Sequence, residues 1–297
     1  MYRTRCSTAA KRVVLTSDAA EIEARTERLL SAHIECNVLA TVLILVLDGV
    51  YRNAGAVFSY GLADDEEVRF AAIRTPPHPL LASPLESDVG AFVGLWLQAD
   101  PDVDRVTSIA TTARAIAAAW AGHTGGAARR AMREAMHVLE EVRDPLRPAP
   151  GELRLAHAGD RSLLIDWMEE FVSEAGVAGA SQGAAMIDSR MRREGILVWD
   201  DGQPVSMVGV TPEVAGVVRI GPVYTPPALR RRGYAGSAVA AASRRALTRG
   251  ARQCMLYTDL DNPTSNKIYA EVGYRRIGDW EEIALERASV RPVPAGV

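Results

Sequence analysis

A mixed α/β fold with a mostly antiparallel central sheet flanked by helices is predicted for this 297-residue chain. In its second half, segments of alternating apolar residues are interspersed with segments of helical periodicity, in the order β-α-α-β-β-β-α-β-α-β. The strand–helix–strand unit at 217–258 adds one parallel pair to the sheet. A segment rich in proline, 143–155, separates two patterned regions and reads as an interdomain linker. We therefore expect two domains, 1–146 and 147–297.

The second half has the clearer element signals. Its helices are bounded by capping residues and glycines, and its hairpin turns at Asp201-Gly202. The expected strands are 151–158, two within 196–212, 217–224, 253–260 and one or two within 275–286, and the expected helices are 160–176, 180–195, 237–250 and 262–274.

The first half is less regular. Two strands around an acidic turn are expected in 55–77. Two segments fit either a helix or a strand, 39–47 and 131–142. The remaining expected elements are helices at 17–31, 85–99 and 111–122.

Composition excludes several classes of function. The net charge of −3 and a pI of about 6.0 give no bulk attraction for nucleic acid. The most apolar window, 37–51, is too short to span a membrane and contains Asp48. The basic start lacks the apolar run of a signal peptide. Three widely spaced cysteines and five scattered histidines show no disulfide or metal pattern, so we expect a cytoplasmic protein without a metal site.

The segment 228–236, ALRRRGYAG, combines positive charge with small residues between a strand and a helix. Unpaired N–H groups and the helix dipole favour an anion at a helix N-terminus, and glycine lets a bulky anion approach the backbone. Arginine side chains can pair with phosphate oxygens. The segment therefore predicts a phosphate or pyrophosphate cradle; the alternative is a soluble arginine-rich turn. It matches neither a Walker A loop nor the G-x-G-x-x-G fingerprint.

Arg230-x-x-Gly233-x-Ala235 resembles the R/Q-x-x-G-x-G/A signature of the GCN5-related N-acetyltransferases (GNAT). The segment YTDLDNPTSNKIYAEVGYRRIG resembles the second signature of that superfamily, and together the two cover roughly 151–290. The resemblance implies that acetyl-CoA lies where two parallel strands splay apart. Its pyrophosphate would lie on the loop made by Arg230, Arg231, Arg232, Gly233, Tyr234, Ala235 and Gly236.

The same resemblance assigns further cofactor contacts. Backbone groups of Val223, Tyr224 and Thr225 would pair with the pantetheine arm and polarise the thioester carbonyl. Gly221-Pro222 predicts a bulge that opens the splay, or merely marks the end of the strand. Asn262 would touch the CoA arm and is also an N-cap candidate. The remaining candidates are Ser265 and Asn266, which fit solvated first-turn residues equally well.

Tyr269 corresponds to the tyrosine that donates a proton to the departing thiolate in many family members. The alternative is a tyrosine that packs its helix on the sheet. Cys254 reads as a buried strand thiol rather than a nucleophile. The general base stays open between an ordered water relay and five carboxylates, Glu169, Glu170, Glu174, Glu213 and Asp259.

The first half resembles a faded copy of the second. Thr75-Pro76-Pro77 follows an apolar strand, as Thr225-Pro226-Pro227 does. The arginines, the loop glycine and the Asn and Tyr of the second signature are missing from the first copy. If the two halves are tandem copies, a degenerate GNAT-like half, 1–146, keeps the fold without the cofactor cradle and shapes the acceptor pocket. The alternative is a chance tripeptide match, with 1–146 an accessory α/β domain.

The predicted function is transfer of the acetyl group of acetyl-CoA to a primary amine by direct attack in a ternary complex. The acceptor is a small-molecule or peptide amine, because fold kinship does not specify it. The alternative is a non-catalytic acyl-CoA sensor. The oligomeric state stays open.

Overall fold

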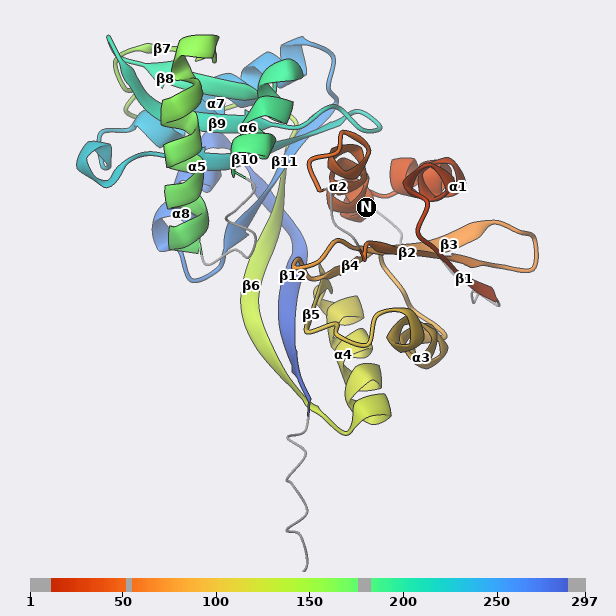
Figure 1. The fold of residues 1–297 in the computed structure, drawn as a ribbon. Coiled ribbons are helices and arrows are strands. Elements are labelled where there is room, and N and C mark those ends of the chain that lie inside the picture. Colours follow the sequence, from red (N-terminus) through yellow and green to blue (C-terminus); the bar gives the residue numbers. More distant parts are fainter. Residues whose placement is uncertain (1–11, 52–54, 176–182, 288–297) are drawn as a thin grey trace, which may run out of the picture. The chain divides into compact units, whose positions relative to one another are not determined.

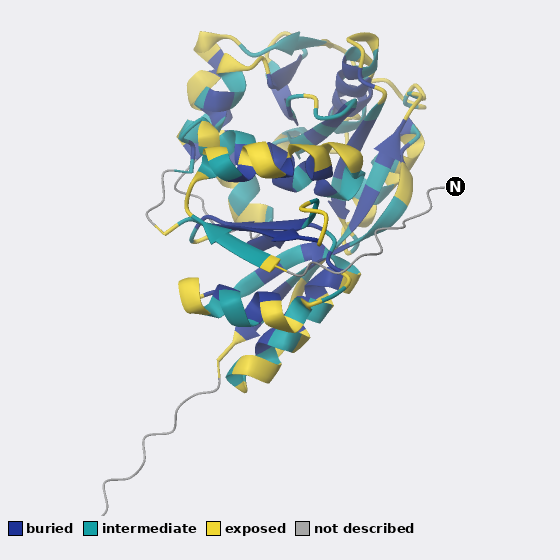
Figure 2. Cartoon of the chain, turned by 90° about the vertical axis from the view of Figure 1, so that its right-hand side faces the viewer, coloured by how far each residue is buried: buried dark blue, intermediate teal, exposed yellow. Residues whose placement is uncertain are grey.

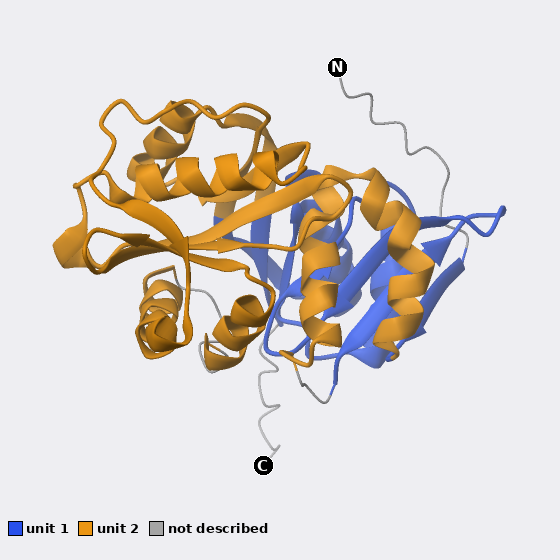
Figure 3. Cartoon of the chain, turned by 90° about the horizontal axis from the view of Figure 1, so that it is seen from above, with its two compact units in different colours: residues 1–17, 55–132, 281–297 blue, residues 18–54, 133–280 orange. Residues whose placement is uncertain are grey.

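The structure is a computed structural model that describes residues 12–51, 55–175 and 183–287. Its residues group into two compact units, coloured separately in Figure 3. Unit 1 comprises 1–17, 55–132 and 281–297, and unit 2 comprises 18–54 and 133–280. Each unit is built from separate stretches of the chain. The division into domains 1–146 and 147–297 therefore stays a prediction.

The first half contains two helices near its start and a long strand at its end (Figure 1). Segment 37–47 is helical, and the open segment 131–142 belongs largely to a strand. Its elements are β1 (Arg12–Thr16), α1 (Ala19–Ala32), η1 (Ile34–Cys36), α2 (Asn37–Leu47), β2 (Val57–Leu62), β3 (Val68–Arg74), β4 (Leu80–Ala82), α3 (Val89–Ala99), β5 (Arg105–Ile109), α4 (Ala110–Thr124) and β6 (Ala127–Leu139).

The second half follows its predicted element order. Its elements are β7 (Glu152–Leu155), η2 (Ala158–Asp160), α5 (Arg161–Ala175), α6 (Gly183–Arg192), β8 (Ile196–Asp200), β9 (Pro204–Val210), β10 (Val217–Tyr224), η4 (Pro227–Leu229), α7 (Tyr234–Thr248), β11 (Gln253–Asp259), α8 (Pro263–Val272) and β12 (Arg275–Glu286). Residues 180–182 of the second predicted helix lie outside the described residues.

The two halves repeat one order of helices and strands, β-α-α-β-β-β-α-β-α-β. The repeat confirms the tandem architecture but corrects the alignment between the halves. Thr75 follows β3, whereas Thr225 follows β10, whose counterpart in the repeat is β4. The two Thr-Pro-Pro segments therefore follow strands that are not equivalent in the repeat, since β3 precedes the true counterpart of β10 by one strand. The segment equivalent to the arginine loop is the one between β4 and α3, residues 83–88.

Unit 1 has the strand order β1-β2-β3-β4-β5-β12, in which β4 and β5 are parallel. Helices α3 and α4 pack on it through large apolar side chains, Phe92, Trp96 and Trp120 among them, each no more than 1% exposed. Inside the unit, Arg74 forms an ion pair of 2.6 Å with Asp100, and both side chains are buried. Unit 1 therefore has a core of its own.

Unit 2 has the strand order β12-β6-β11-β10-β9-β8-β7. On one face α7 packs against Val208, Val218 and Leu256, and on the other α5 and α6 pack against Val198, Met207 and Tyr224. Burial is concentrated on the strands and on the helix faces turned toward them (Figure 2). We call the face that carries Tyr224 the α5/α6 face of the sheet.

The predicted parallel pair is confirmed between β10 and β11. The predicted bulge is confirmed as well, since the register of β10 against β9 shifts between Ile220 and Val223. The proline-rich segment 143–150 is packed rather than free: Ala149 N–H donates to Ser237 Oγ (2.9 Å), and Trp199 Nε1 donates to the carbonyl of Pro150 (2.8 Å). None of the described helices is long and apolar enough to cross a membrane.

Candidate active site

Strands β10 and β11 are paired only over their first residues and then separate. Three residue pairs join the strands, from Val217↔Gln253 to Arg219↔Met255, and no further pair forms between them among the described residues. Beyond Arg219, β10 continues through the bulge to Tyr224 while it stays paired with β9. The edge of β10 that faces β11 is thus open at Val223 and Tyr224. This is the splay that the GNAT resemblance implies.

The loop after β10 leads directly into the N-terminus of α7. The backbone is left-handed at Arg231 (φ 64°) and again at Gly233 (φ 85°), which is the N-cap of the helix. The first intrahelical bond is donated by Ser237 N–H to the carbonyl of Gly233 (3.0 Å). The N–H groups of residues 234–236 therefore have no partner within the helix, as an anion site at a helix N-terminus requires.

Gly233 is required by its surroundings as well as by its conformation. A Cβ at this position would lie 3.1 Å from the carbonyl oxygen of Arg147 and 3.6 Å from Ala149 Cβ. Substitution would strain the left-handed backbone and press on segment 143–150. A Gly233 variant would therefore disturb the local fold, and tests of the loop should use its side chains instead.

The three arginines of the loop have different contacts. Arg231 and Arg232 are exposed, and Arg232 donates a bond to the carbonyl of Ala228 (3.3 Å). Arg230 instead turns toward α5: it forms an ion pair with Glu174 (2.6 Å), and its guanidinium lies 5.7 Å from the ring centroid of Tyr224. Arg230 would have to leave Glu174 to bind a diphosphate, so its cofactor role stays a prediction.

Tyr234, Ala235 and Gly236 form the first turn of α7. The Tyr234 side chain is buried, and its hydroxyl donates to Asp201 (2.7 Å), which fixes the helix start to the β8–β9 turn. Gly236 passes close to α8, because a Cβ there would meet Ile268 at 3.7 Å. The first turn of α7 therefore lies next to the helix that carries Tyr269.

Val223 and Tyr224 end the strand at the splay, and Thr225 follows them. The carbonyl of Tyr224 accepts a bond from Ser206 Oγ (2.9 Å), and the carbonyl of Thr225 accepts one from Arg230 Nε (2.9 Å). These bonds fix the backbone where the thioester is predicted to lie.

The polar residues at the start of α8 hold the local backbone. Asn262 is the N-cap, and its Oδ1 accepts a bond from Ser265 N–H (3.1 Å), which confirms the capping alternative. Asn266 Nδ2 donates to the carbonyl of Asp259 (3.1 Å). Contacts of Asn262, Ser265 and Asn266 with CoA stay predictions.

Tyr269 packs against the core of unit 2, with its ring 6.1 Å from that of Tyr274 in an edge-on arrangement. Burial raises its pKa to about 12, so the phenol is protonated at neutral pH and can donate a proton. Burial likewise raises the pKa of Cys254 to about 12, so this thiol is not a nucleophile. Tyr269 has the protonation state that a general acid needs.

An acidic pocket adjoins the end of β10. An open pocket of about 500 Å³ is lined by Tyr224 and Pro227 and by four residues of α5, namely Glu169, Glu170, Ser173 and Glu174. The Tyr224 hydroxyl donates to Glu170 (2.7 Å) and lies 3.4 Å from Glu174. Burial, together with the bond to Glu170, raises the pKa of Tyr224, which keeps this hydroxyl a donor. Three of the five candidate bases are thus gathered at the splay.

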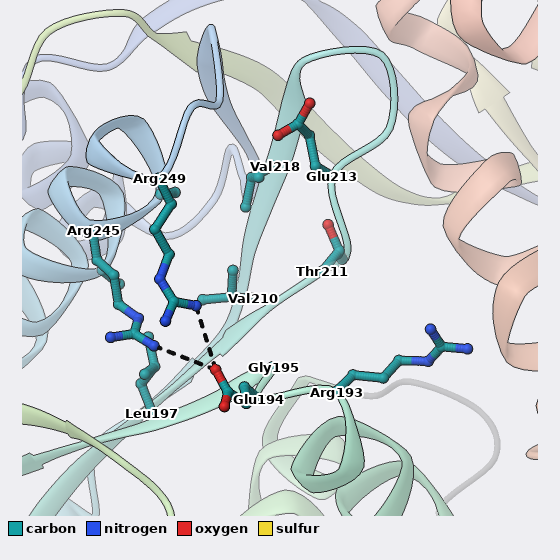
Figure 4. Close-up of a pocket in the computed structure, with 12 residues that line it drawn as sticks. Arg193, Glu194, Gly195, Leu197, Val210, Thr211, Glu213, Val218, Arg245 and Arg249 are labelled. Carbon is teal, nitrogen blue, oxygen red and sulfur yellow. Dashed lines mark hydrogen bonds and ion pairs between the residues drawn. The ribbon is translucent and has the colours of Figure 1, made fainter.

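The other two candidate bases lie elsewhere. Asp259 accepts a bond from Asp261 N–H (2.8 Å) in the loop after β11. Glu213 lines a second cavity, shown in Figure 4, together with Arg245 and Arg249, which both pair with Glu194. That cavity lies at the C-terminal end of α7. A helix of 15 residues, roughly 20 Å, separates it from the arginine loop, so we do not assign it to the cofactor.

The equivalent loop of the first half has the opposite charge. Residues 83–88, SPLESD, connect β4 to α3, and Asp88 is the left-handed N-cap (φ 58°) where the second half has Gly233. Glu86 and Asp88 are both exposed. Two carboxylates at this position repel a diphosphate. Among the described residues, no group of three or more His, Cys, Asp or Glu side chains is arranged to hold a metal ion.

Comparison with known proteins agrees with this geometry. Residues 162–274 match the sequence profile of the acetyltransferase (GNAT) family. No curated protein matches the chain significantly. The matched stretch, which is less than half of the chain, contains the first signature, most of the second, the splay and the acidic pocket.

Solved structures extend the likeness of fold to both halves. The GCN5-related N-acetyltransferase from Sphaerobacter thermophilus superimposes with a TM-score of 0.60 at 19% identity, over 95% of this chain and 98% of that one. A GNAT acetyltransferase from Colwellia psychrerythraea gives 0.60 at 10% identity, over 93% and 100%. A tandem GNAT protein from the clavulanic acid biosynthesis pathway gives 0.58 at 14% identity, over 94% and 100%. The chain therefore has the tandem GNAT fold.

Proposed function

We propose that the protein transfers the acetyl group of acetyl-CoA to a primary amine by direct attack within a ternary complex. The observation that carries the proposal is the open edge of β10 at Val223 and Tyr224, which leads directly into the unpaired N–H groups at the start of α7. The extended pantetheine arm can form strand-like hydrogen bonds with the open edge of β10. The diphosphate can bind the unpaired N–H groups at the start of α7. Arg231 and Arg232 add positive charge beside the diphosphate.

Each step of the proposed reaction is assigned to a group of the protein. The amine enters at the acidic pocket, where Glu170 accepts its proton before or during attack on the thioester carbonyl. Backbone N–H groups at residues 223–225 stabilise the oxyanion that forms on the carbonyl. The C–S bond then breaks, and Tyr269 donates its proton to the departing thiolate.

The first half takes no part in binding CoA. Its equivalent loop presents Glu86 and Asp88 instead of arginines and glycine. Its helices α1 and α2 nevertheless belong to unit 2 with the proposed active site. Asp48 at the end of α2 accepts bonds from Ser189 (3.0 Å) and from Arg193 Nε (2.7 Å), which ties α2 to α6. We assign to α1 and α2 a role in enclosing the acceptor side of the site.

Release of free CoA thiol in the presence of acetyl-CoA and a panel of amines tests the proposal. Thiol release that depends on an amine supports a transferase. Tight acetyl-CoA binding without thiol release for any amine would instead indicate the sensor function.

A further inference from the structure

The α5/α6 face of unit 2 carries two half-buried arginines, and neither has an acidic partner among the described residues. Arg190 lies on α6 and Arg219 on β10, and neither forms an ion pair with any described carboxylate. The segments that the structure does not describe contain no Asp or Glu at all. Enclosed guanidinium groups are normally paired, because an isolated buried charge is costly.

Arg190 lies at the bulge of β10. An added Cβ on Gly209 would stand 2.6 Å from Arg190 Nη1 and 2.5 Å from the carbonyl oxygen of Gly221. Arg190 Nη1 and the Gly221 carbonyl thus occupy the space beside β9 that a side chain at position 209 would need, which places the guanidinium directly at the bulge. Gly221 precedes Val223 and Tyr224 by two to three residues, roughly 7–10 Å along the strand. The guanidinium therefore stands within the length of a small molecule from the open edge of β10.

Two buried polar atoms of this region have no hydrogen-bond partner, Arg190 Nε and the Tyr257 hydroxyl. Burial, together with the nearby charge of Arg219, lowers the pKa of Arg190 to about 10. Burial raises the pKa of Tyr257, so its hydroxyl stays protonated. Both atoms are therefore donors at neutral pH, and what they lack is an acceptor.

The described contacts of Arg219 do not supply a charged acceptor. Arg219 Nη2 donates to Thr41 Oγ1 of α2 (2.8 Å), a neutral partner. The groups that raise the pKa of Arg219 against the effect of burial are, in decreasing order, Tyr257, Tyr51 and Glu134. The apolar wall includes Ile34, Val217 and Met255. The surroundings therefore favour binding of one further anion.

We infer that Arg190 and Arg219 bind a carboxylate of the acceptor, so that the substrate is an amino carboxylate with its amine at the Glu170 pocket and its carboxylate at the bulge of β10. The inference rests on the proposed function and names the substrate class of that site. Paired guanidinium groups match the planar carboxylate with parallel hydrogen bonds. The separation of the two sites favours an amine and a carboxylate several carbons apart.

The test measures thiol release from acetyl-CoA by the full-length protein with a series of ω-amino carboxylates, from glycine to 6-aminohexanoate. Each acid is compared with its own primary amide, and 2-aminoethyl phosphate is added as a separate arm. We expect at least one acid to exceed its amide about 10- to 100-fold in kcat/KM, the range of a charge-assisted bond. Calorimetry of the CoA-saturated protein with that acid should show binding that its amide lacks.

Arg190→Met should reduce this preference about 10- to 100-fold, and Arg190→Lys should restore part of it. The melting temperature of Arg190→Met should not fall, because the variant removes an unpaired enclosed charge. Arg192→Met, an exposed arginine two residues further along α6, should keep the full preference.

Three results would overturn the inference. Acetyl-CoA binding and thiol release with acids and amides used equally would show that no carboxylate is recognised. An undiminished preference in Arg190→Met would place recognition elsewhere, and a preference for 2-aminoethyl phosphate over every acid would replace the carboxylate with a phosphate. Failure to bind acetyl-CoA at all is a different result, which contradicts the proposed function itself and this inference with it.

Discussion

The hydroxyl of Tyr224, at the end of β10, donates a hydrogen bond of 2.7 Å to Glu170 on α5. This bond joins the strand edge where the thioester is proposed to lie to the acidic pocket where the amine is proposed to enter. The two residues are 54 positions apart in the sequence. Tyr224 remains protonated because its pKa is raised, so it keeps a Glu170 oxygen oriented while the carboxylate retains free lone pairs for an amine.

Glu170→Gln should lower kcat by about 100-fold or more, the usual contribution of a general base. The amide of glutamine cannot accept the proton that the amine must lose, whereas binding of acetyl-CoA should be unaffected. The measurements are kcat with a fixed amine and the affinity for acetyl-CoA. Glu169→Gln, one position along the helix, is the matched control and should keep the wild-type kcat. A wild-type kcat in Glu170→Gln would remove Glu170 from the mechanism.

Tyr269→Phe should lower kcat by about 100-fold while the KM for acetyl-CoA changes little. A general acid must be protonated, and the raised pKa of about 12 means that wild-type activity should not decline from phenol ionisation below roughly pH 11. Steady-state kinetics between pH 6 and 10 measure both effects.

Tyr274→Phe is the control for the tyrosine prediction. The Tyr274 hydroxyl is buried and lies 2.8 Å from Ser243 Oγ, so its loss should reduce the free energy of unfolding by about 1 kcal/mol without a matching fall in kcat. Equal loss of kcat in both variants would mean that Tyr269 acts only through packing.

The double variant Arg231→Ala/Arg232→Ala should weaken CoA binding at least about 10-fold at low salt, because two exposed cations beside the diphosphate are lost. The difference from wild type should shrink as salt is added. Calorimetry at two ionic strengths measures both. Arg244→Ala, which removes an exposed arginine from α7 that pairs with Asp144, is the control and should bind as wild type.

Asp100→Ala should destabilise unit 1 by about 3 kcal/mol, since it leaves the buried Arg74 without its closest partner. The residue also accepts a bond from Trp96 Nε1 (3.1 Å). Denaturant unfolding measures the loss. The affinity of the folded variant for CoA should be unchanged, because the cofactor site is assigned to unit 2; reduced affinity in the folded protein would contradict that assignment.

The sequence predicted the second half well because its elements have strong local signals. Alternating apolar residues defined β8, β9 and β10, and Gly250 and Gly273 follow the ends of α7 and α8. In the first half β1, β4 and β5 were missed. Strand β4 has three residues, and β5 leads directly into α4, so neither shows an alternating pattern bounded by turn residues.

The candidate site was predictable only in part. The loop 230–236 was recognisable because its residues are contiguous, so the motif survives without knowledge of the fold. The pairing of Arg230 with Glu174, and the lack of a hydrogen-bond partner for Arg190 Nε among the described residues, depend on how α5, α6 and β10 pack together. The Thr-Pro-Pro match misled the alignment of the halves, because a tripeptide carries less information than the order of the elements around it.

Titration calorimetry of acetyl-CoA into the purified full-length protein tests the central claim most directly. The account predicts one molecule of acetyl-CoA bound per chain, with binding weakened in Arg231→Ala/Arg232→Ala. Absence of heat at millimolar acetyl-CoA, or two equivalent sites per chain, would contradict it.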